Sequence, residues 1–417
     1  MNPKSPAKLD ALTGLRYIAA LTVLLTHMAG NFPEGAIKKY THSIAGIGMS
    51  LFFVLSGFLM VYNYSSSFQT AYRKTLWRYV VARFARIYPI YIIALFFWLS
   101  VVSTFFNDLK QNPSDTQKSL LYIGTMTQSW VHIPVFVGTP GARTVAFGFM
   151  GVAWSVSTEV FFYLVFPFVV LPMAALIRRG AQALVAGLIV YMGFMLIDSP
   201  HEDWYAFHDR DPEQWRWLIY VCPYIRLGEF LLGGVVGQYF LVRKSAPITG
   251  ARNWWIASAT LAACIVVLVR VNYFINSNPP GYAFLKLAEK NILLAPAGAG
   301  IIYFMASLPC MLQRVLGSRP MVLLGNASYA MYLMHPVFQW YYGVRVLGEG
   351  TLKNRSIIIY NNVALFVSLH IFCLGMYTYV EVPLRDWIRN IFDGRKKERA
   401  GKETLAFPGA ANDRAAA

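Results

Sequence analysis

The chain has 417 residues, of which 56% are hydrophobic and only 14% are charged, and its mean hydropathy is +0.45. This composition excludes a soluble globular protein and indicates an all-α, polytopic helical membrane protein. The net charge of +17 does not indicate nucleic-acid binding, because the basic residues lie in short segments between apolar runs. The four cysteines have neither metal-site nor disulfide-framework spacing.

Ten apolar runs are long enough to span a bilayer. They cover residues 13–30, 44–63, 87–106, 154–176, 182–198, 217–241, 254–273, 291–309, 321–343 and 357–380. With the N-terminus in the cytoplasm, the segments on that side hold 22 of the 37 lysines and arginines, in keeping with the positive-inside tendency. The sequence therefore predicts about ten transmembrane helices with both termini cytoplasmic.

Two further regions complete this scheme. Residues 119–137 are moderately apolar, but counting them as a span would place Arg178 and Arg179 outside, so we predict an interfacial or re-entrant segment. Residues 395–417 are charged and then alanine-rich, which indicates a disordered cytoplasmic tail. The membrane domain is accordingly predicted to cover residues 1–394.

The first span carries two ionisable residues, Arg16 and His27. Their separation of eleven residues corresponds to about three helical turns, so both project from one face, about 16 Å apart along the axis. Arg16 could simply reach the headgroups and His27 could sit at an interface. The shared face favours the alternative that both line a polar interior, because ionisable residues within spans usually face one.

Arg83 and Arg86 precede the third span and share a helical face. Two guanidinium groups in this arrangement suit the bidentate binding of phosphate oxygens. The alternative is that these residues only set topology or bind anionic lipid, and the charges alone favour it.

Three later spans also carry polar residues. Entering from outside, the fourth span places Glu159 about two turns deep, where a carboxylate needs a partner or a polar cavity. Ser328 and His335 lie seven residues apart, hence on one face of the ninth span, and Arg226 and Glu229 form a candidate ion pair in the sixth. For His335 and for the Arg226–Glu229 pair, a polar contact that holds helices together is the stronger alternative to chemistry.

Several motifs occur in an order typical of one family. They are Arg16 with His27, Ser50-Leu-Phe-Phe-Val-Leu-Ser56-Gly57-Phe58, Arg83-x-x-Arg86 followed by Tyr88-Pro89, Trp154-Ser-x-Ser157-x-Glu159-x-x-x-Tyr163, and Ser328-Tyr329-x-x-Tyr332-Leu-x-His335. In this ordered set the chain resembles the acyltransferase-3 family of integral membrane acyltransferases over most of residues 10–385.

The resemblance implies an O-acetyltransferase with a ten-helix core in the bacterial inner membrane. It would transfer an acyl group, most often acetyl, from cytosolic acyl-coenzyme A to a hydroxyl of a cell-surface or lipid-linked glycan. His27 would be catalytic, and Arg16, Arg83 and Arg86 would bind the donor. Acyl-coenzyme A would be a co-substrate, with no permanently bound cofactor or metal. Some relatives carry a fused extracytoplasmic domain; this chain would act alone or with a separate extracytoplasmic partner.

The residues support a mechanism consistent with this resemblance. Neutral His27 could take the proton from a sugar hydroxyl that attacks the thioester, and Glu159 could orient the imidazole. An acyl-histidine intermediate is an open alternative. The expected substrate channel is lined by Trp154, Ser157, Tyr163, Arg226, Glu229, Ser328 and His335. A transporter or glycan exporter is the rival function, since buried Arg, His and Glu would serve a proton-coupled carrier, and a sensor or scaffold is a third.

Overall fold

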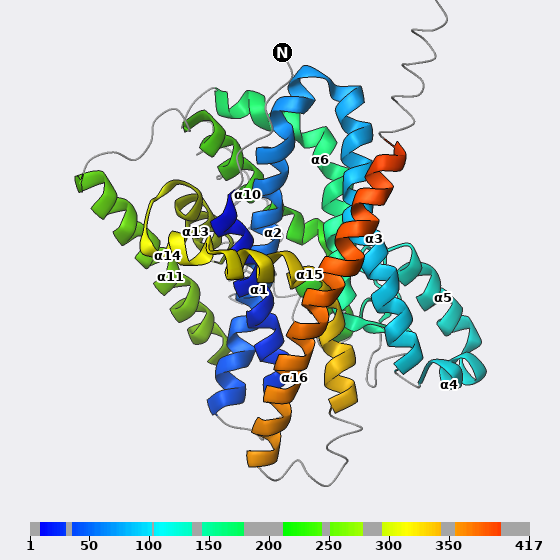
Figure 1. Ribbon diagram of the computed structural model, residues 1–417. Coiled ribbons are helices and arrows are strands. Elements are labelled where there is room, and N and C mark those ends of the chain that lie inside the picture. Colours follow the sequence, from blue (N-terminus) through cyan, green and yellow to red (C-terminus); the bar gives the residue numbers. More distant parts are fainter. Residues whose placement is uncertain are drawn as a thin grey trace, which may run out of the picture.

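A computed structural model describes residues 9–30, 36–101, 104–135, 144–178, 212–243, 251–277, 294–342 and 355–392. These ranges are almost entirely helical (Figure 1). They contain no β-strand and only an isolated antiparallel bridge between Pro134 and Thr144. The predicted all-α polytopic fold is therefore confirmed.

The long helices are α1 (Asp10–Ala29), α2 (Ala36–Thr70), α3 (Tyr72–Val101), α6 (Trp154–Arg178), α10 (Pro223–Arg243), α11 (Ala251–Ser277), α13 (Ala295–Ser307), α15 (Arg319–Trp340) and α16 (Arg355–Met376). Helix α16 continues through the π-turn η7 (Tyr377–Glu381) to residue 392. The shorter elements are α4 (Thr104–Gln111), α5 (Pro113–Gly124), η1 (Val145–Phe147), η2 (Gly151–Ala153), α9 (Pro212–Arg216), η3 (Trp217–Val221) and α14 (Met311–Leu316).

Six helical segments in the described ranges are long and apolar enough to cross a membrane. They are Asp10–Ala29, Gly46–Thr70, Tyr72–Val101, Gly151–Ala175, Pro223–Arg243 and Ser356–Phe392. Helices α11 and α13 match two more of the predicted spans, but their apolar stretches are shorter. The predicted span at residues 182–198 and the tail at 395–417 lie outside the described residues, so the count of ten stays a prediction.

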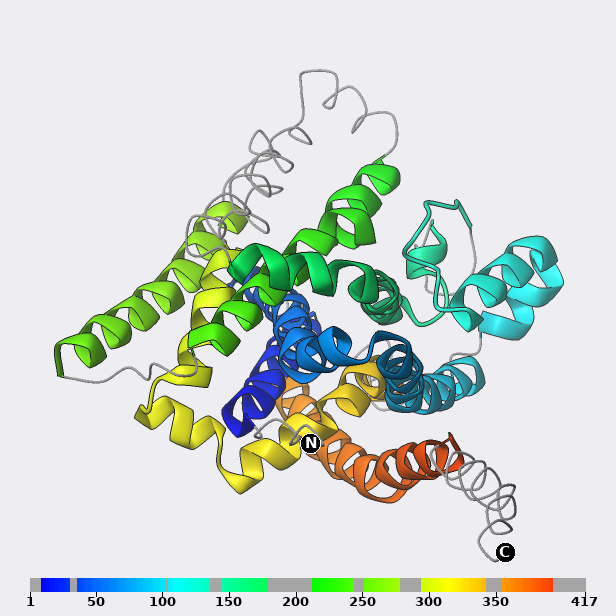
Figure 2. The same ribbon diagram turned by 90° about the horizontal axis from the view of Figure 1, so that it is seen from above.

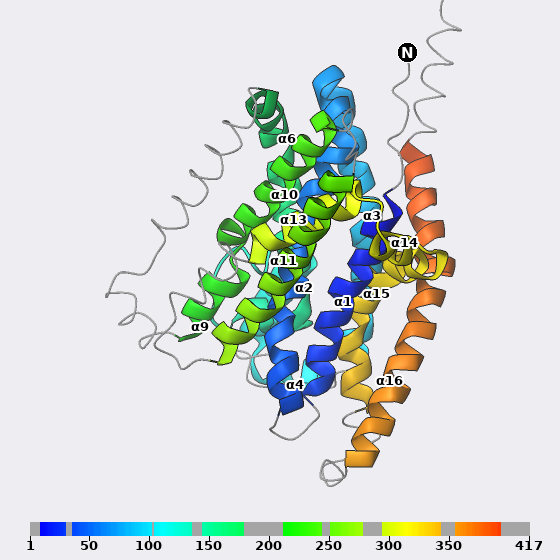
Figure 3. The same cartoon turned by 90° about the vertical axis from the view of Figure 1, so that its left-hand side faces the viewer.

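Five of the long helices pack in the order α10, α2, α1, α15, α16, as Figure 3 shows. Helix α3 packs against α2 and α15, helix α6 packs against α10 and α2, and α11 and α13 lie beside α2. The turn between α2 and α3 and the C-terminal end of α16 lie toward the same end of the bundle (Figure 1). A ring contact between Trp77 and Phe392, with centroids 5.7 Å apart, joins them.

Glycines allow two pairs of helices to approach closely. A Cβ atom at Gly57 of α2 would collide with the carbonyl oxygen of Phe230 in α10. A Cβ atom at Gly325 of α15 would likewise collide with the carbonyl oxygen of Thr13 in α1. Small residues at such crossings bring backbones together and let side chains on either side of the crossing meet. Gly325 therefore sets how closely α15 approaches α1.

Two regions differ from, or refine, the expected topology. Arg83 and Arg86, expected to precede the third span, belong to the same continuous helix, α3, which also contains Pro89. Thirty helical residues extend about 45 Å, so α3 is longer than a single crossing of a hydrocarbon core of about 30 Å requires. Within residues 119–137, α5 ends at Gly124 and is followed by turns. Helices α4 and α5 stand to one side of the bundle (Figure 2).

Candidate active site

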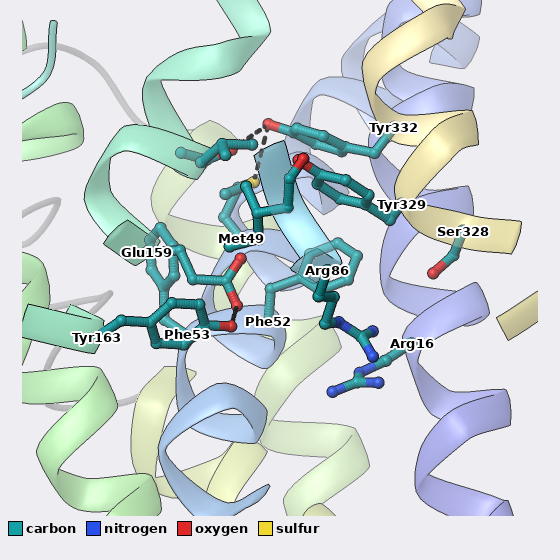
Figure 4. A pocket seen from close by; sticks show the side chains of 13 residues that line it. Arg16, Met49, Phe52, Phe53, Arg86, Glu159, Tyr163, Ser328, Tyr329 and Tyr332 are labelled. Carbon is teal, nitrogen blue, oxygen red and sulfur yellow. Dashed lines mark hydrogen bonds between the residues drawn. The ribbon is translucent and has the colours of Figure 1, made fainter. Parts of the chain in front are cut away.

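A cavity of about 70 Å³, termed here the arginine pocket, lies among α1, α2, α3, α6 and α15. Figure 4 shows the guanidinium groups of Arg16 and Arg86 next to one another on one side, with Glu159 and Tyr163 on the opposite side. The complete lining is Arg16, Met49, Phe52, Phe53, Arg86, Ile87, Ser155, Val156, Glu159, Tyr163, Ser328, Tyr329 and Tyr332. The pocket thus combines two cations and a carboxylate with an apolar wall.

Helical periodicity explains how α6 contributes to the pocket. Ser155, Glu159 and Tyr163 are spaced by four residues, so they lie one above another on a single face. On α15, Ser328 and Tyr332 have the same spacing and line the facing wall. The pocket is therefore built from one polar stripe on each of two helices, with the arginines of α1 and α3 between them.

The Glu159 carboxylate lies in the same part of the site as the arginines. Its Oε1 accepts hydrogen bonds from the hydroxyl of Tyr163 and from Ser56 Oγ, the latter at 3.1 Å. Arg16 is within electrostatic range of both Glu159 and Arg86. This geometry places the carboxylate with the arginines, and the expected orientation of the His27 imidazole by Glu159 stays a prediction.

The ring beside His27 belongs instead to His335. His27 Nδ1 lies 2.9 Å from His335 Nε2, and the two rings stack with centroids 4.9 Å apart. His335 is buried, with 1% of its surface exposed, whereas His27 is exposed. Because Thr13 meets Gly325 and His27 meets His335, α1 and α15 run in the same direction. This parallel packing brings the two histidines together.

Tyr332 connects the pocket with the histidine pair. Its hydroxyl accepts a hydrogen bond from Ser155 Oγ at 2.7 Å and donates to the carbonyl of Val152 at 3.0 Å. The Tyr332 ring also lies edge-on to the His335 ring, with centroids 5.8 Å apart. The arginine pocket and the histidine pair are therefore neighbouring parts of one site, separated by a single aromatic side chain.

Arg83 lies next to the arginine pocket rather than in its lining. It donates a hydrogen bond to the Tyr64 hydroxyl at 3.1 Å, and its guanidinium lies 5.4 Å from the centroid of Tyr64 and 5.5 Å from that of Tyr163. Its buried Nε has no hydrogen-bond partner among the described residues. Arg83 is therefore positioned by aromatic rings while keeping a donor available.

The C-terminal end of α16 adds more charge beside Arg83. Arg389 is within electrostatic range of Arg83, Arg385 and Tyr64, and its buried Nε also has no hydrogen-bond partner in the described part of the chain. Glu381, which is 3% exposed, is within range of Arg16, Arg86 and Arg385. The arginines at this end therefore come from α1, α3 and α16, which the sequence places far apart.

Arg226 and Glu229 do not line the arginine pocket, and their expected place in a substrate channel stays a prediction. They form an ion pair at 3.0 Å with side chains 1% and 0% exposed, and Ser50 Oγ donates to Glu229 Oε1 at 2.6 Å. The Arg226 guanidinium lies 5.7 Å from the ring centroid of Phe53, which itself lines the pocket. The pair holds α10 to α2 behind the pocket wall, as the structural alternative predicts.

Trp154 and Ser157 are also placed away from the pocket lining. Trp154 packs against Phe53 and Tyr220, with centroids 6.2 and 5.0 Å apart. Ser157 Oγ accepts hydrogen bonds from the backbone N–H and the hydroxyl of Ser129, at 3.1 and 2.7 Å. Both residues fix the start of α6 to its neighbours, because they project from faces of α6 other than that of Glu159.

Several residues in and around this site were not among the predicted site residues. Ser155 and Tyr332 could have been found, because they continue the four-residue stripes of Glu159 and Ser328. Arg389 had no such signal, since its proximity to Arg83 depends on how α16 packs. Tyr17 and His370, paired at 3.0 Å between α1 and α16, are likewise joined only by the tertiary structure.

By its fold and site, this protein is a membrane-embedded helical bundle with a cationic pocket next to a histidine pair. Comparison with known proteins specifies the family: the model of an acyltransferase domain matches residues 9–379. The chain therefore belongs to this acyltransferase family, and its enzyme class is acyltransferase. It is an integral, multi-pass membrane protein. This assignment favours the enzyme over the transporter and the sensor alternatives.

Three relatives illustrate the similarity. The chain is 27% identical to Acyltransferase MdmB of Streptomyces mycarofaciens, over 83% of this chain and 82% of that protein. It is 20% identical to Peptidoglycan O-acetyltransferase OatA of Listeria monocytogenes, over 93% of this chain and 57% of the relative. It is 21% identical to O-acetyltransferase OatA of Staphylococcus aureus, over 91% and 58%. The chain thus spans little more than half the length of the two OatA proteins. No solved structure matches the chain.

Proposed function

We propose that this protein transfers an acetyl group from cytosolic acetyl-coenzyme A to a hydroxyl of a cell-surface or lipid-linked glycan, in the bacterial inner membrane. The observation that carries the proposal is the adjacency of the two parts of the site. An arginine-rich pocket suited to an anionic donor lies one aromatic side chain away from an exposed histidine suited to proton transfer. Relatives named as O-acetyltransferases support acetyl as the acyl group.

The donor is expected to bind at the arginine end. Acyl-coenzyme A carries several phosphate groups, and guanidinium groups bind phosphate oxygens in a bidentate manner. Arg16, Arg86, Arg83 and Arg389 come together there, and two of them keep buried Nε donors without partners among the described residues. The excess of lysines and arginines in the segments at this end supports a cytoplasmic orientation for it, on the side where acyl-coenzyme A is made.

The size of the arginine pocket suits the acyl end of the donor. A cavity of about 70 Å³ has room for several water-sized groups, which is comparable to an acetyl thioester. Met49, Phe52 and Phe53 provide an apolar wall for it. The phosphates would then stay at the arginine end, while the thioester approaches the histidine pair past Tyr332.

His27 is proposed to act first as a general base and then as a general acid. The imidazole nitrogen that carries the lone pair takes the proton of the sugar hydroxyl as the oxygen attacks the thioester carbonyl. The tetrahedral intermediate collapses, the C–S bond breaks, and the proton passes from His27 to the departing coenzyme A thiolate. The alternative, an acyl-histidine intermediate, uses the same residue and differs in transferring the acyl group in two steps.

The acceptor is proposed to be a glycan and to approach from the His27 end. His27 is exposed, whereas its partner His335 is buried, so only His27 can meet an incoming hydroxyl. The OatA of Listeria monocytogenes is named for peptidoglycan, a glycan polymer. We extend to this chain only the glycan class of that acceptor. A separate extracytoplasmic partner is proposed to take part in the transfer to this acceptor.

Purified protein in lipid vesicles tests this function. With radiolabelled acetyl-coenzyme A and a lipid-linked glycan acceptor, His27→Ala is expected to abolish transfer while the protein remains in the membrane at normal levels. Arg83→Ala and Arg86→Ala are expected to weaken acetyl-coenzyme A binding. Arg78→Ala is the matched control, because Arg78 is an exposed arginine on the same helix. Full transfer by His27→Ala would refute the catalytic assignment, and unchanged donor affinity in both arginine variants would refute the donor site.

A further inference from the structure

His335 makes two hydrogen bonds that together determine where its protons lie. His335 Nδ1 lies 2.7 Å from the backbone carbonyl oxygen of Tyr332, which precedes it by three residues on the same helix. A carbonyl oxygen can only accept a hydrogen bond, so Nδ1 must carry the hydrogen. In a neutral imidazole the other nitrogen, Nε2, then carries the lone pair and can only accept.

This arrangement also determines which ring nitrogen of His27 carries the hydrogen. His335 Nε2 lies 2.9 Å from His27 Nδ1. Because His335 Nε2 accepts, His27 Nδ1 must donate, and it therefore carries the hydrogen of a neutral His27. The lone pair of His27 is then on Nε2. The backbone carbonyl of Tyr332 thus fixes the tautomer of a ring on a different helix, through His335.

We propose that His335 is the positioning residue that keeps His27 in the Nδ1–H tautomer, with Nε2 as the basic atom. This inference rests on the proposed role of His27 in acyl transfer. The same contact serves the charged state that follows proton uptake, because the Nδ1–H of the His27 imidazolium still donates to the His335 lone pair. A carboxylate performs this orienting task in serine hydrolases. Here a buried neutral imidazole occupies that position.

Burial and packing keep His335 fixed in this role. Its side chain is 1% exposed, its ring stacks on that of His27, and the Tyr332 ring lies edge-on to it. A buried ring packed against these two rings cannot rotate to exchange its two nitrogens without breaking both hydrogen bonds. The structure therefore explains why a histidine at this position of α15 contributes to the reaction without contacting the acceptor.

Two substitutions separate positioning from packing. In His335→Gln the amide can donate to the Tyr332 carbonyl and accept from His27 Nδ1, so both hydrogen bonds can be retained. In His335→Met the side chain has a similar length but its sulfur is only a weak acceptor. We expect kcat of His335→Met to fall on the order of 10³-fold with KM for the acetyl donor little changed, as loss of the correct tautomer does in serine hydrolases. His335→Gln is expected to stay within about tenfold of the wild type.

A spectroscopic measurement tests the tautomer without depending on activity. Solid-state ¹⁵N NMR of histidine-labelled protein in vesicles, with His27→Gln used to assign the His27 signals, distinguishes a protonated ring nitrogen from one with a lone pair. We expect wild-type His27 to be protonated at Nδ1 and His335→Met to show a mixture. A wild-type His27 protonated at Nε2 would overturn the inference, as would equal kcat values for the Gln and Met variants. If His27→Ala itself remained active, the proposed function would fail instead, whatever the tautomer.

Discussion

The buried ion pair between Arg226 and Glu229 provides a direct test of which polar residues hold the bundle together and which take part in the reaction. The side chains are 1% and 0% exposed and lie 3.0 Å apart. Replacing Glu229 by Leu leaves the Arg226 guanidinium buried without its counter-charge, and it also removes the acceptor of the Ser50 hydroxyl. The double variant Arg226→Met/Glu229→Leu removes both charges and keeps apolar volume at the site.

Because both charges are buried, the expected losses of folding stability differ between the two variants. Removing one partner of a buried ion pair costs about 3–5 kcal/mol, because the remaining charge is uncompensated. Replacing both partners with apolar residues of similar volume is often neutral, so most of that loss should be recovered. The Ser50 hydroxyl then lacks its acceptor, which costs roughly 1–3 kcal/mol. We therefore expect Glu229→Leu to be severely destabilised and the double variant to be destabilised only by the smaller amount.

Thermal unfolding of detergent-purified protein, monitored by size-exclusion chromatography, measures the stability of the wild type, Glu229→Leu and the double variant. Acetyl transfer per folded molecule measures function. We expect the double variant to recover most of the unfolding temperature and to transfer acetyl at a rate close to that of the wild type. If the double variant folded as well as the wild type but transferred no acetyl, the pair would belong to the reaction path and our structural assignment would be wrong.

Two further predictions concern helix contact and donor binding. Gly325→Ala is expected to lose about 1–3 kcal/mol of stability and to lower transfer, because the added methyl group would push α15 away from Thr13 and separate the two histidines. Gly375→Ala is the control: a Cβ at Gly375 meets nothing within 4 Å, so thermal unfolding and activity should be unchanged or slightly improved. Arg389→Ala is expected to raise the Kd for acetyl-coenzyme A severalfold, by loss of one charge-assisted contact, while Arg73→Ala, at an exposed position, leaves it unchanged. Isothermal titration or filter binding distinguishes these outcomes, and equal Kd values for the two arginine variants would exclude α16 from the donor site.

The sequence determined the features that depend on local pattern. Apolar runs of spanning length require helices, because a bilayer offers no partner for an unpaired backbone group. The eleven-residue spacing placed Arg16 and His27 on one face, and the four-residue period of α6 put Glu159 and Tyr163 on one wall. The ordered motifs indicated the acyltransferase family, which the match over residues 9–379 confirms.

The tertiary structure decided which of these polar residues meet. The ring next to His27 is that of His335, because Gly325 brings α15 against α1 in a parallel orientation. Arg389 joins the arginine end through the packing of α16, and no local spacing encodes that contact. A sequence period fixes the face of one helix, but it cannot fix the rotation and height of a neighbouring helix. Those depend on close backbone contacts between residues that lie hundreds of positions apart in the chain.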